Sequence, residues 1–200
     1  YTVTPENDLV VPGVNNDFIL DPGTVDILAG NTTAQINLNI LPDVKYENNE
    51  TVTIALTTVP AAFDDKSSAG NANMSHDYVI TNDDDLPKIN FEGDSTSVFE
   101  DDASIRLKVS LTAISGVAST VQYAISGTAD EEGSNKDFTD NTDPAISNTL
   151  AWDADTEQDQ YIDISFTDDN IDEDTETIII TLSNHSGGAT TNGSDKLVYK

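Results

Sequence analysis

Residues 168–176, with the sequence DDNIDEDTE, carry six carboxylates in nine positions: Asp168, Asp169, Asp172, Glu173, Asp174 and Glu176. Two carboxylates about 4 Å apart repel each other by roughly 4 kcal/mol at an effective dielectric constant near 20. A folded chain that keeps such a run needs a compensating positive charge, which a divalent cation supplies. Ca²⁺ takes about six to eight oxygen ligands, mostly carboxylates and carbonyls. The run therefore predicts a calcium site to which several loops contribute.

The composition excludes several partners. The chain has 200 residues, with 37 acidic and 8 basic side chains and a formal net charge of −29. Nucleic acids and anionic membranes repel such a surface, so we expect neither as a partner. No apolar stretch approaches the ~20 residues of a transmembrane helix, so we expect no membrane insertion. The chain has no Cys, and its stability outside a cell would have to come from packing and bound metal.

The elements that must position these acids are short strands. Apolar residues alternate with polar ones over residues 105–111, 121–125, 161–166 and 177–181. A period of two places alternate side chains on one face of a sheet. Clusters of Gly, Asn, Asp and Ser separate these segments, and no segment of a dozen residues shows a helical period. The pattern predicts an all-β sandwich.

The chain also repeats itself with a period of about 120 residues. The matching pairs are NNDF at 15–18 with NKDF at 135–138, AQINLNI at 34–40 with QYIDISF at 160–166, and ENNETVTIAL at 47–56 with EDTETIIITL at 173–182. We therefore predict two domains, residues 1–85 and 86–200.

The two predicted domains differ in completeness. Tyr1 aligns with Tyr123, midway through a strand, so the first domain is N-terminally incomplete and lacks its opening strands. The last strand of the second domain is cut at Lys200. A sandwich without its opening strands would expose an apolar edge. We expect the missing strands to come from chain that precedes Tyr1, with a neighbouring subunit as the alternative donor.

Three motifs occur in a fixed order in the second repeat, and a fourth lies at the junction before it. Glu100 ends a strand, Gly127-Thr-Ala leads to Asp137-Phe138, the acidic run 168–176 precedes another strand, and Asn82-Asp-Asp-Asp-Leu-Pro87 closes the preceding repeat. Together they resemble the Calx-beta domain family, found in sodium–calcium exchangers and many bacterial surface proteins. The resemblance covers nearly the whole chain. It implies tandem immunoglobulin-like antiparallel β-sandwiches that bind calcium at one end.

The resemblance also implies the ligands. In the second domain they would be the carboxylates of Glu100, Asp137, Asp168, Asp169, Glu173 and Glu176 and the backbone oxygen of Ile171. So many acids predict more than one Ca²⁺. In the first domain the candidates are Asp17, Asp43, Glu47, Glu50, Asp83, Asp84 and Asp85. Pro42 and Lys45 stand there in place of Asp168 and Ile171, so we expect fewer ions, about one.

Other interpretations of the acids are weaker. Acidic runs are often solvated loops, and a halophile's surface is acidic everywhere, but these acids cluster at loop positions. An EF-hand needs a Gly at its sixth position and flanking helices, which the run lacks. Glycoside hydrolysis needs an acid of raised pKa in a cleft lined by aromatic residues. Aromatic residues make up only 6% of the chain, and no nucleophile motif is found, so we expect no enzyme.

The sequence therefore predicts a calcium-binding structural repeat of a secreted or cell-surface protein, such as an adhesin or fibre. Its partners would be neighbouring repeats or subunits, with any cell-surface or matrix ligand bound by other domains. Calcium at the loop tips and at the Asp83–Asp85 junction would rigidify it. The alternatives are a calcium-sensing regulatory module and a filament subunit completed by strands from a neighbour.

Overall fold

The computed structural model describes residues 2–5, 17–56, 75–93, 95–99, 101–133, 136–142, 148–169, 171–191 and 195–199. Within these ranges every regular element is a β-strand, and no helix is long and apolar enough to cross a membrane. The chain divides into unit 1, Tyr1–Val44 with Asn48–Asp83, and unit 2, Lys45–Glu47 with Asp84–Lys200. The predicted all-β class is confirmed.

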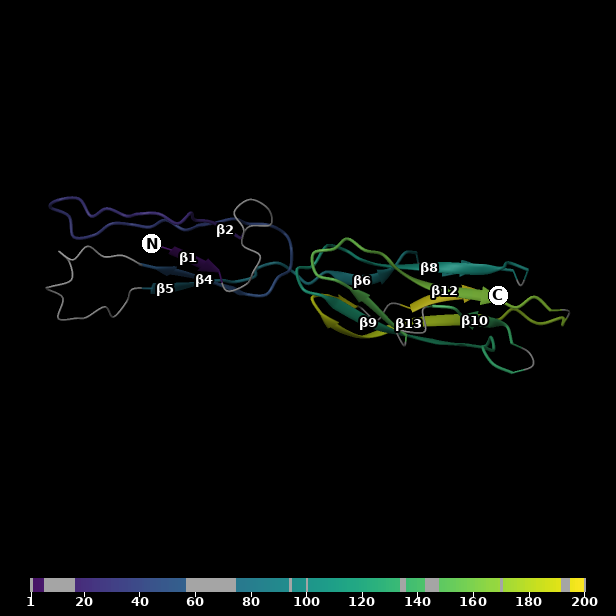
Figure 1. Cartoon of the computed structure of the whole chain (residues 1–200). Coiled ribbons are helices and arrows are strands. Elements are labelled where there is room, and N and C mark those ends of the chain that lie inside the picture. The colour runs from purple at the N-terminus through teal and green to yellow at the C-terminus, as the bar shows by residue number, and fades with distance from the viewer. Residues whose placement is uncertain are drawn as a thin grey trace. The chain divides into compact units, whose positions relative to one another are not determined.

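Unit 2 is a sandwich of two five-stranded sheets (Figure 1). The first has the order β10 (Phe138–Asp140), β12 (Gln160–Phe166), β8 (Ser104–Leu111), β6 (Lys88–Phe91) and β14 (Thr190–Thr191). The second has the order β11 (Thr149–Trp152), β9 (Ser119–Gly127), β13 (Thr177–Gly187), β15 (Asp195–Tyr199) and β7 (Ser95–Ser97).

Most neighbouring strands of unit 2 are antiparallel, as predicted, but two short pairs are parallel. These are β14 with β6 and β15 with β7. β6 and β7 belong to different sheets although they follow each other in the chain. Gly93 lies where the chain leaves β6 and has φ of +76°, a value that favours glycine. The alternating pattern did not reveal this change of sheet, because each of the two strands is short.

The core of unit 2 follows the alternation of its strands. In β13, Ile178, Ile180 and Leu182 point inward and are 0%, 0% and 1% exposed. They belong to one apolar cluster with Leu107 and Val109 of β8, Ile162 and Ile164 of β12, and Leu150 and Trp152 of β11. Complete burial of one such side chain contributes about 1.5–3 kcal/mol. The facing sheets are held together mainly by this cluster.

The described residues of unit 1 form two smaller sheets. The first has the order β1 (Thr2–Pro5), β4 (Glu50–Ala55) and β5 (Ser75–Ile80). The second pairs β2 (Phe18–Ile19) with β3 (Asn39–Ile40).

The strand registers of unit 1 reproduce those of unit 2. Phe18 faces Ile40 in unit 1, and Phe138 faces Phe166 in unit 2. Val3 faces Ile54 as Ile125 faces Ile180, and Val52 faces Tyr78 as Ile178 faces Val198. The sequence repeat is thus a repeat of hydrogen-bonding register.

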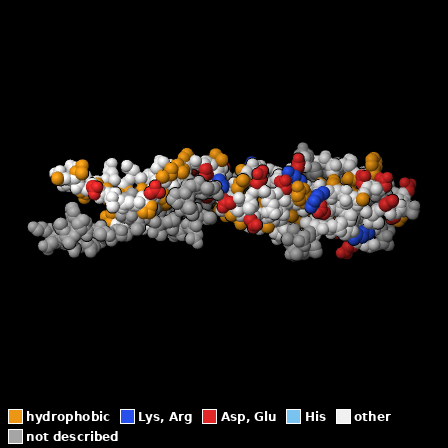
Figure 2. Space-filling view, turned by 45° about the horizontal axis from the view of Figure 1, so that its top comes forward, with side chains coloured by type: hydrophobic (Ala, Val, Ile, Leu, Met, Phe, Trp, Pro, Cys, Tyr) orange, Lys and Arg blue, Asp and Glu red, His pale blue; other side chains and the backbone are white. Residues whose placement is uncertain are grey.

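Unit 1 leaves much of its apolar surface uncovered. Val52 and Ile54 of β4 and Phe18 of β2 are buried. In contrast, the exposed large apolar side chains of this unit are Ile19, Val25, Ile27, Leu28, Ile40, Val44, Leu56, Tyr78 and Val79. Figure 2 shows hydrophobic side chains on the surface of this part of the chain. Exposed apolar residues are ordinary on a protein surface, and these come from several separate segments of the unit.

Candidate metal centre

Strand polarity gathers acids at one end of unit 2. β9 ends at Gly127 and β12 ends at Phe166, whereas β10 and β13 begin at Phe138 and Thr177. Because β10 is antiparallel to β12 and β13 to β9, these four ends meet at the same end of the sandwich. Asp137 directly precedes β10 and Glu176 directly precedes β13. The loops that the sequence marks as acidic are therefore neighbours in space.

Asp137 is the most firmly held of these acids. Its side chain is buried, and the residue is 4% exposed. The backbone N–H of Asp130 donates to Asp137 Oδ2 at 2.6 Å, and the N–H of Asp137 donates to the carbonyl of Asp130 at 2.8 Å. The N–H of Thr167 donates to the carbonyl of Asp137 at 2.8 Å. These bonds fix the carboxylate and connect the loop before β10 to the end of β12.

Glu173 and Glu176 complete the cluster. One carboxylate oxygen from each of Asp137, Glu173 and Glu176 lies within 4.8 Å of the others. Oε2 of Glu176 is buried from solvent. A buried carboxylate beside two others is costly without a cation, and oxygens at this spacing suit a hard divalent ion. The donor set, three carboxylates and no nitrogen or sulfur, fits Ca²⁺.

Two loops of this end are joined by hydrogen bonds near the cluster. The N–H groups of Thr128 and Ala129 donate to the carbonyl of Thr177 at 2.9 and 3.2 Å. In return, the N–H of Thr177 donates to Thr128 Oγ1 at 2.9 Å. Gly127, with φ of +138°, makes this approach possible, because a Cβ there would lie 1.9 Å from the carbonyl oxygen of Thr177. The position of Glu176 is therefore set by backbone contacts on its C-terminal side.

The other residues predicted for this site are placed differently. Asp168 and Asp169 are not part of the three-carboxylate group, although the same loop carries them. Oδ1 of Asp169 accepts the N–H of Ile171 at 2.6 Å, which closes a local turn. Ile171 itself is 47% exposed. Glu100 lies outside the described residues.

Unit 1 brings together two of its predicted ligands. Carboxylate oxygens of Asp17, which precedes β2, and Asp43 lie within 4.8 Å of each other. Glu50 begins β4 and is half-buried, while Asp83 and Asp85 are exposed and Asp84 is half-buried. None of these four joins a close acidic group among the described residues. The role of all the predicted site residues stays a prediction.

Glu47 has a cationic neighbour that the sequence did not assign to it. Lys45 Nζ forms ion pairs with Glu47 Oε1 and with Asp155 Oδ1, the latter at 2.6 Å. Burial alone would lower the pKa of Lys45, but its bonds to Asp155 and Glu47 outweigh that effect and raise the pKa. Lys45 therefore stays charged and neutralises part of this acidic segment. The sequence hint of an unusual role for Lys45 was its alignment with Ile171 of the second repeat. Asp155 is 110 residues away and could not be foreseen.

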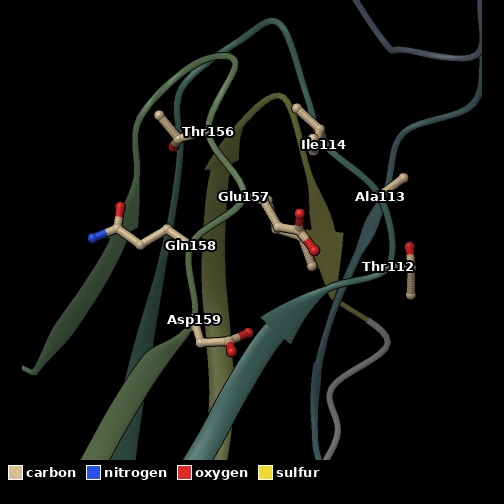
Figure 3. A pocket seen from close by; sticks show the side chains of 8 residues that line it. Thr112, Ala113, Ile114, Thr156, Glu157, Gln158 and Asp159 are labelled. Atoms are coloured by element: carbon tan, nitrogen blue, oxygen red, sulfur yellow. The ribbon is translucent and has the colours of Figure 1, made fainter.

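A second concave site lies at the opposite end of unit 2. It has a volume of about 230 Å³, and its walls are Thr112–Ile114 after β8 and Thr156–Asp159 before β12 (Figure 3). Asp159 already pairs with Lys108 at 2.8 Å, and this hydrogen bond raises the pKa of Lys108. Glu157 is the other acid of the cavity wall, and one carboxylate offers too few oxygens for Ca²⁺. The cavity is a poorer cation site than the three-carboxylate cluster.

The two-sheet fold, its internal repeat and the acidic loops at one end define the class of protein: a tandem-repeat β-sandwich with clustered carboxylates. The family model named "Calx-beta domain" matches residues 13–85 and 82–198. The chain belongs to the Calx-beta family and contains two copies of its domain, as the sequence predicted. No curated protein gives a significant match.

The solved structures to which the chain is similar include domains of Calx proteins. The apo form of the Calx CBD1 domain is 20% identical, with a TM-score of 0.44, and the match covers 57% of this chain and 96% of that one. CBD12 from CALX1.2 is 19% identical, with a TM-score of 0.44 and coverage of 56% and 42%. The calcium binding domain CBD12 of CALX1.1 is 16% identical, with a TM-score of 0.39 and coverage of 74% and 53%. The chain thus spans about half of each CBD12 structure.

Proposed function

We propose that this chain is a calcium-binding structural module of a secreted or cell-surface protein, in which the ion stiffens the loop end of unit 2. The observation that carries the proposal is the cluster of Asp137, Glu173 and Glu176. Each member comes from a segment that directly precedes a strand. An ion shared by these carboxylates would tie the start of β10 to the start of β13.

The residues would act as follows. Asp137 offers a carboxylate that backbone bonds already orient, so little conformational freedom is lost when it binds an ion. Glu173 and Glu176 supply two further negative charges from one loop. The bound ion supplies charge neutralisation and links loops that otherwise repel. Asp168, Asp169 and the Ile171 carbonyl belong to the same loop, and we propose them as further ligands when the loop closes on an ion.

The extracellular setting fits the chemistry of the chain. A net charge of −29 keeps the protein soluble and favours calcium at the millimolar concentrations found outside cells. The family contains calcium-binding modules, as the name of the CBD12 structure of CALX1.1 states for that protein. We propose adhesin or fibre as the context, with neighbouring repeats or subunits as partners. No residue arrangement in the described structure supports a catalytic role.

Calorimetric titration of the full chain with CaCl₂ tests the proposal. We expect saturable binding, and an increase in the melting temperature of unit 2 that EDTA reverses. Glu173→Gln and Glu176→Gln should each weaken binding by about tenfold or more, because each removes one charge from the ligand set. Glu157→Gln is the matched control, since it removes an equal charge from an exposed loop outside the cluster. Equal losses in all three variants would show that only net charge matters.

A calcium-sensing module is the second candidate function. The affinity for Ca²⁺ distinguishes a sensor from a structural module. Sensors bind Ca²⁺ with dissociation constants of about 10⁻⁷–10⁻⁵ M, whereas extracellular modules bind it at about 10⁻⁴–10⁻³ M. Most described residues of the loop 168–176 are exposed, and an open loop of low rigidity favours the weaker range. A micromolar constant in the same titration would instead support the sensor.

A further inference from the structure

Three residues of the first sequence repeat, Lys45–Glu47, are built into unit 2. They are half-buried, whereas residues 42–44 and 48–49 on either side are exposed. Tyr46 forms an isolated parallel β-bridge with Ser115, in the connection between β8 and β9. The backbone N–H of Gly116 donates to the carbonyl of Tyr46 at 2.9 Å. Because β8 ends and β9 begins there, the segment is seated at the end of unit 2 opposite the three-carboxylate cluster.

The surface beneath the segment is fixed by backbone contacts. Ser115 is 3% exposed, and its carbonyl accepts the N–H of Asp155 at 2.9 Å. Its Oγ accepts the N–H of Val117 at 3.1 Å. Gly116 leaves space for Glu47, because a Cβ at Gly116 would lie 2.8 Å from Glu47 Cγ. Unit 2 therefore lacks a side chain at the place where the segment lies against it.

Lys45 makes the charged contact of the segment. Its Nζ lies 2.6 Å from Asp155 Oδ1 and also pairs with Glu47 Oε1. The side chains of Lys45 and Glu47 are only 19% and 23% exposed. A partly buried ion pair is screened by salt less than a surface pair is. The ammonium group is thus shared by a carboxylate of the segment and a carboxylate of the surface beneath it.

The Lys45–Asp155 pair has no charged counterpart in the other repeat. Ile171 stands in the second repeat at the position of Lys45. Asp155 closes the turn that precedes β12, and the turn at the same place in the first repeat closes with Gly30. Both residues have positive φ, +60° for Asp155 and +91° for Gly30, a conformation that Gly adopts most easily. Asp155 thus replaces the residue that the backbone favours, and its carboxylate meets Lys45.

We propose that Ser115, Gly116 and Asp155 form a recognition site for the segment Lys45–Glu47, and that Lys45 is the cation that holds the segment there without a bound metal. The acidic run 168–176 offers carboxylates and no basic side chain, whereas this segment carries its own ammonium group. Lys45 and Asp155 therefore determine which loop fits this end of unit 2. The proposal does not rest on calcium binding, because the two sites lie at opposite ends of the unit.

Trypsin tests the proposal in the full chain, because cleavage after Lys45 requires the segment to leave the site. The rate of such cleavage tracks the population of the locally opened form. Asp155→Asn keeps the shape of the side chain and removes its charge, so it should raise the cleavage rate by about threefold to tenfold. Asp153→Asn is the matched control, because it removes an equal charge from an exposed residue of the same loop. The masses of the fragments identify the bond that is cut.

Amide hydrogen exchange gives a second measurement that does not need a tryptic site. The N–H of Gly116 is bonded to Tyr46, so it should exchange faster in Lys45→Met, which keeps an unbranched side chain without the charge. The N–H of Thr128 is bonded to Thr177 at the other end of unit 2, and its exchange rate should not change. Faster exchange at both amides would mean that Lys45 supports the whole fold, which would contradict the proposal.

An experiment with and without metal separates this proposal from the proposed function. Cleavage after Lys45, measured relative to a peptide substrate in the same digest, should be equally fast in EDTA and in millimolar CaCl₂. If EDTA accelerates it as much as Asp155→Asn does, a bound metal holds the segment and the proposal is wrong. The proposal is also wrong if Asp155→Asn leaves the rate unchanged or if Asp153→Asn raises it equally. The proposed function fails separately, when calorimetry shows no calcium binding while the effect of Asp155→Asn remains.

Discussion

The backbone around Asp137 determines how this residue can act. The Asp130 N–H donates a hydrogen bond to one carboxylate oxygen of Asp137 and so orients the side chain. Because burial leaves Asp137 little rotational freedom, its oxygen is already placed before an ion arrives. Glu173 and Glu176 have longer side chains, and they can adjust to the ion's radius. A fixed ligand combined with adaptable ones suits the flexible coordination of Ca²⁺.

Tyr123 makes the free energy of unfolding of unit 2 depend on pH, independently of any ion at the three-carboxylate cluster. It is 4% exposed, and its hydroxyl donates to Asp140 Oδ2 at 2.8 Å. Burial chiefly, and then the bond to Asp140, raise the pKa of Tyr123 above its ordinary value of 10.0. The folded state therefore holds the proton more tightly than the unfolded state. This contribution to stability is complete below pH 10 and is lost as the pH rises above 10.

We therefore expect Tyr123→Phe to change the alkaline limb of the stability curve. At neutral pH the variant should lose about 1–3 kcal/mol, the value of a buried hydrogen bond to a charged group. Between pH 10 and the raised pKa, the wild type should lose up to about 1.4 kcal/mol per pH unit more than the variant. Urea unfolding at several pH values measures both. Parallel curves for the two proteins would contradict the assignment.

Gly127 is the residue whose backbone permits the loop contacts at the cluster. Its φ is +138°, and the Thr177 carbonyl oxygen lies 1.9 Å from the point that a Cβ would occupy, so any side chain must displace one of the two loops. We expect Gly127→Ala to destabilise unit 2 by about 2–4 kcal/mol and to weaken calcium binding. Gly133→Ala is the matched control, because its φ is +104° but no atom lies within 4 Å of its Cβ position. Equal destabilisation of both variants would show that backbone strain alone is responsible.

At the scale of elements, the two repeats allow a direct comparison of the same strand in two environments. Ile180 of β13 is 0% exposed within the large core of unit 2, and its counterpart Ile54 of β4 is 8% exposed in unit 1, where the buried apolar residues among those described are Phe18, Val52 and Ile54. Ile180→Ala should cost about 3–5 kcal/mol, because the closed core cannot fill the cavity that forms. Ile54→Ala should cost about 1–3 kcal/mol, because fewer described apolar side chains are buried around Ile54 than around Ile180.

Trp152 makes this comparison measurable. It is the single tryptophan of the chain, and it is buried in unit 2, where its Nε1–H donates to the carbonyl of Gln158 at 2.7 Å. Tryptophan fluorescence therefore reports unfolding of unit 2, and circular dichroism reports both units. Ile180→Ala should shift the fluorescence midpoint in urea, whereas Ile54→Ala should leave it in place. A shift with Ile54→Ala would mean that the units do not unfold independently.

The elements were largely predictable because their signal is local. Alternation marked β8, β9, β12 and β13, and the matched segments gave the common register of both repeats. The separation of β6 and β7 between two sheets was not predictable, because four and three residues are too few to show a period. The family resemblance placed Asp137 and Glu176 in one set of candidate ligands, and the structure brings their carboxylates together. The hydrogen bond from the Ile171 N–H to Asp169 and the ion pair between Lys45 and Asp155 depend on loop geometry. The spacing of residues along the sequence does not reveal that geometry.

At the scale of the whole molecule, the net charge of −29 acts on stability in addition to any specific site. Self-repulsion of the folded chain falls as salt rises, because the screening length shrinks to about 8–10 Å near physiological ionic strength. Sodium chloride should therefore stabilise both units gradually. An ion that binds only the folded state stabilises it by mass action. The free energy of unfolding then rises by about 2.7 kcal/mol when the free ion concentration is a hundred times the dissociation constant.

The two effects can be separated at constant ionic strength. In about 0.15 M NaCl, where the screening length is about 8 Å, a few millimolar CaCl₂ changes the ionic strength and the screening only slightly. We expect it nevertheless to raise the melting temperature of unit 2, as followed by Trp152 fluorescence. MgCl₂ at the same concentration should have a smaller effect, because Mg²⁺ demands octahedral geometry and gives up its water reluctantly. Equal shifts with Ca²⁺, Mg²⁺ and ionic-strength-matched NaCl would mean that the clustered acids respond to ionic atmosphere and hold no ion of their own.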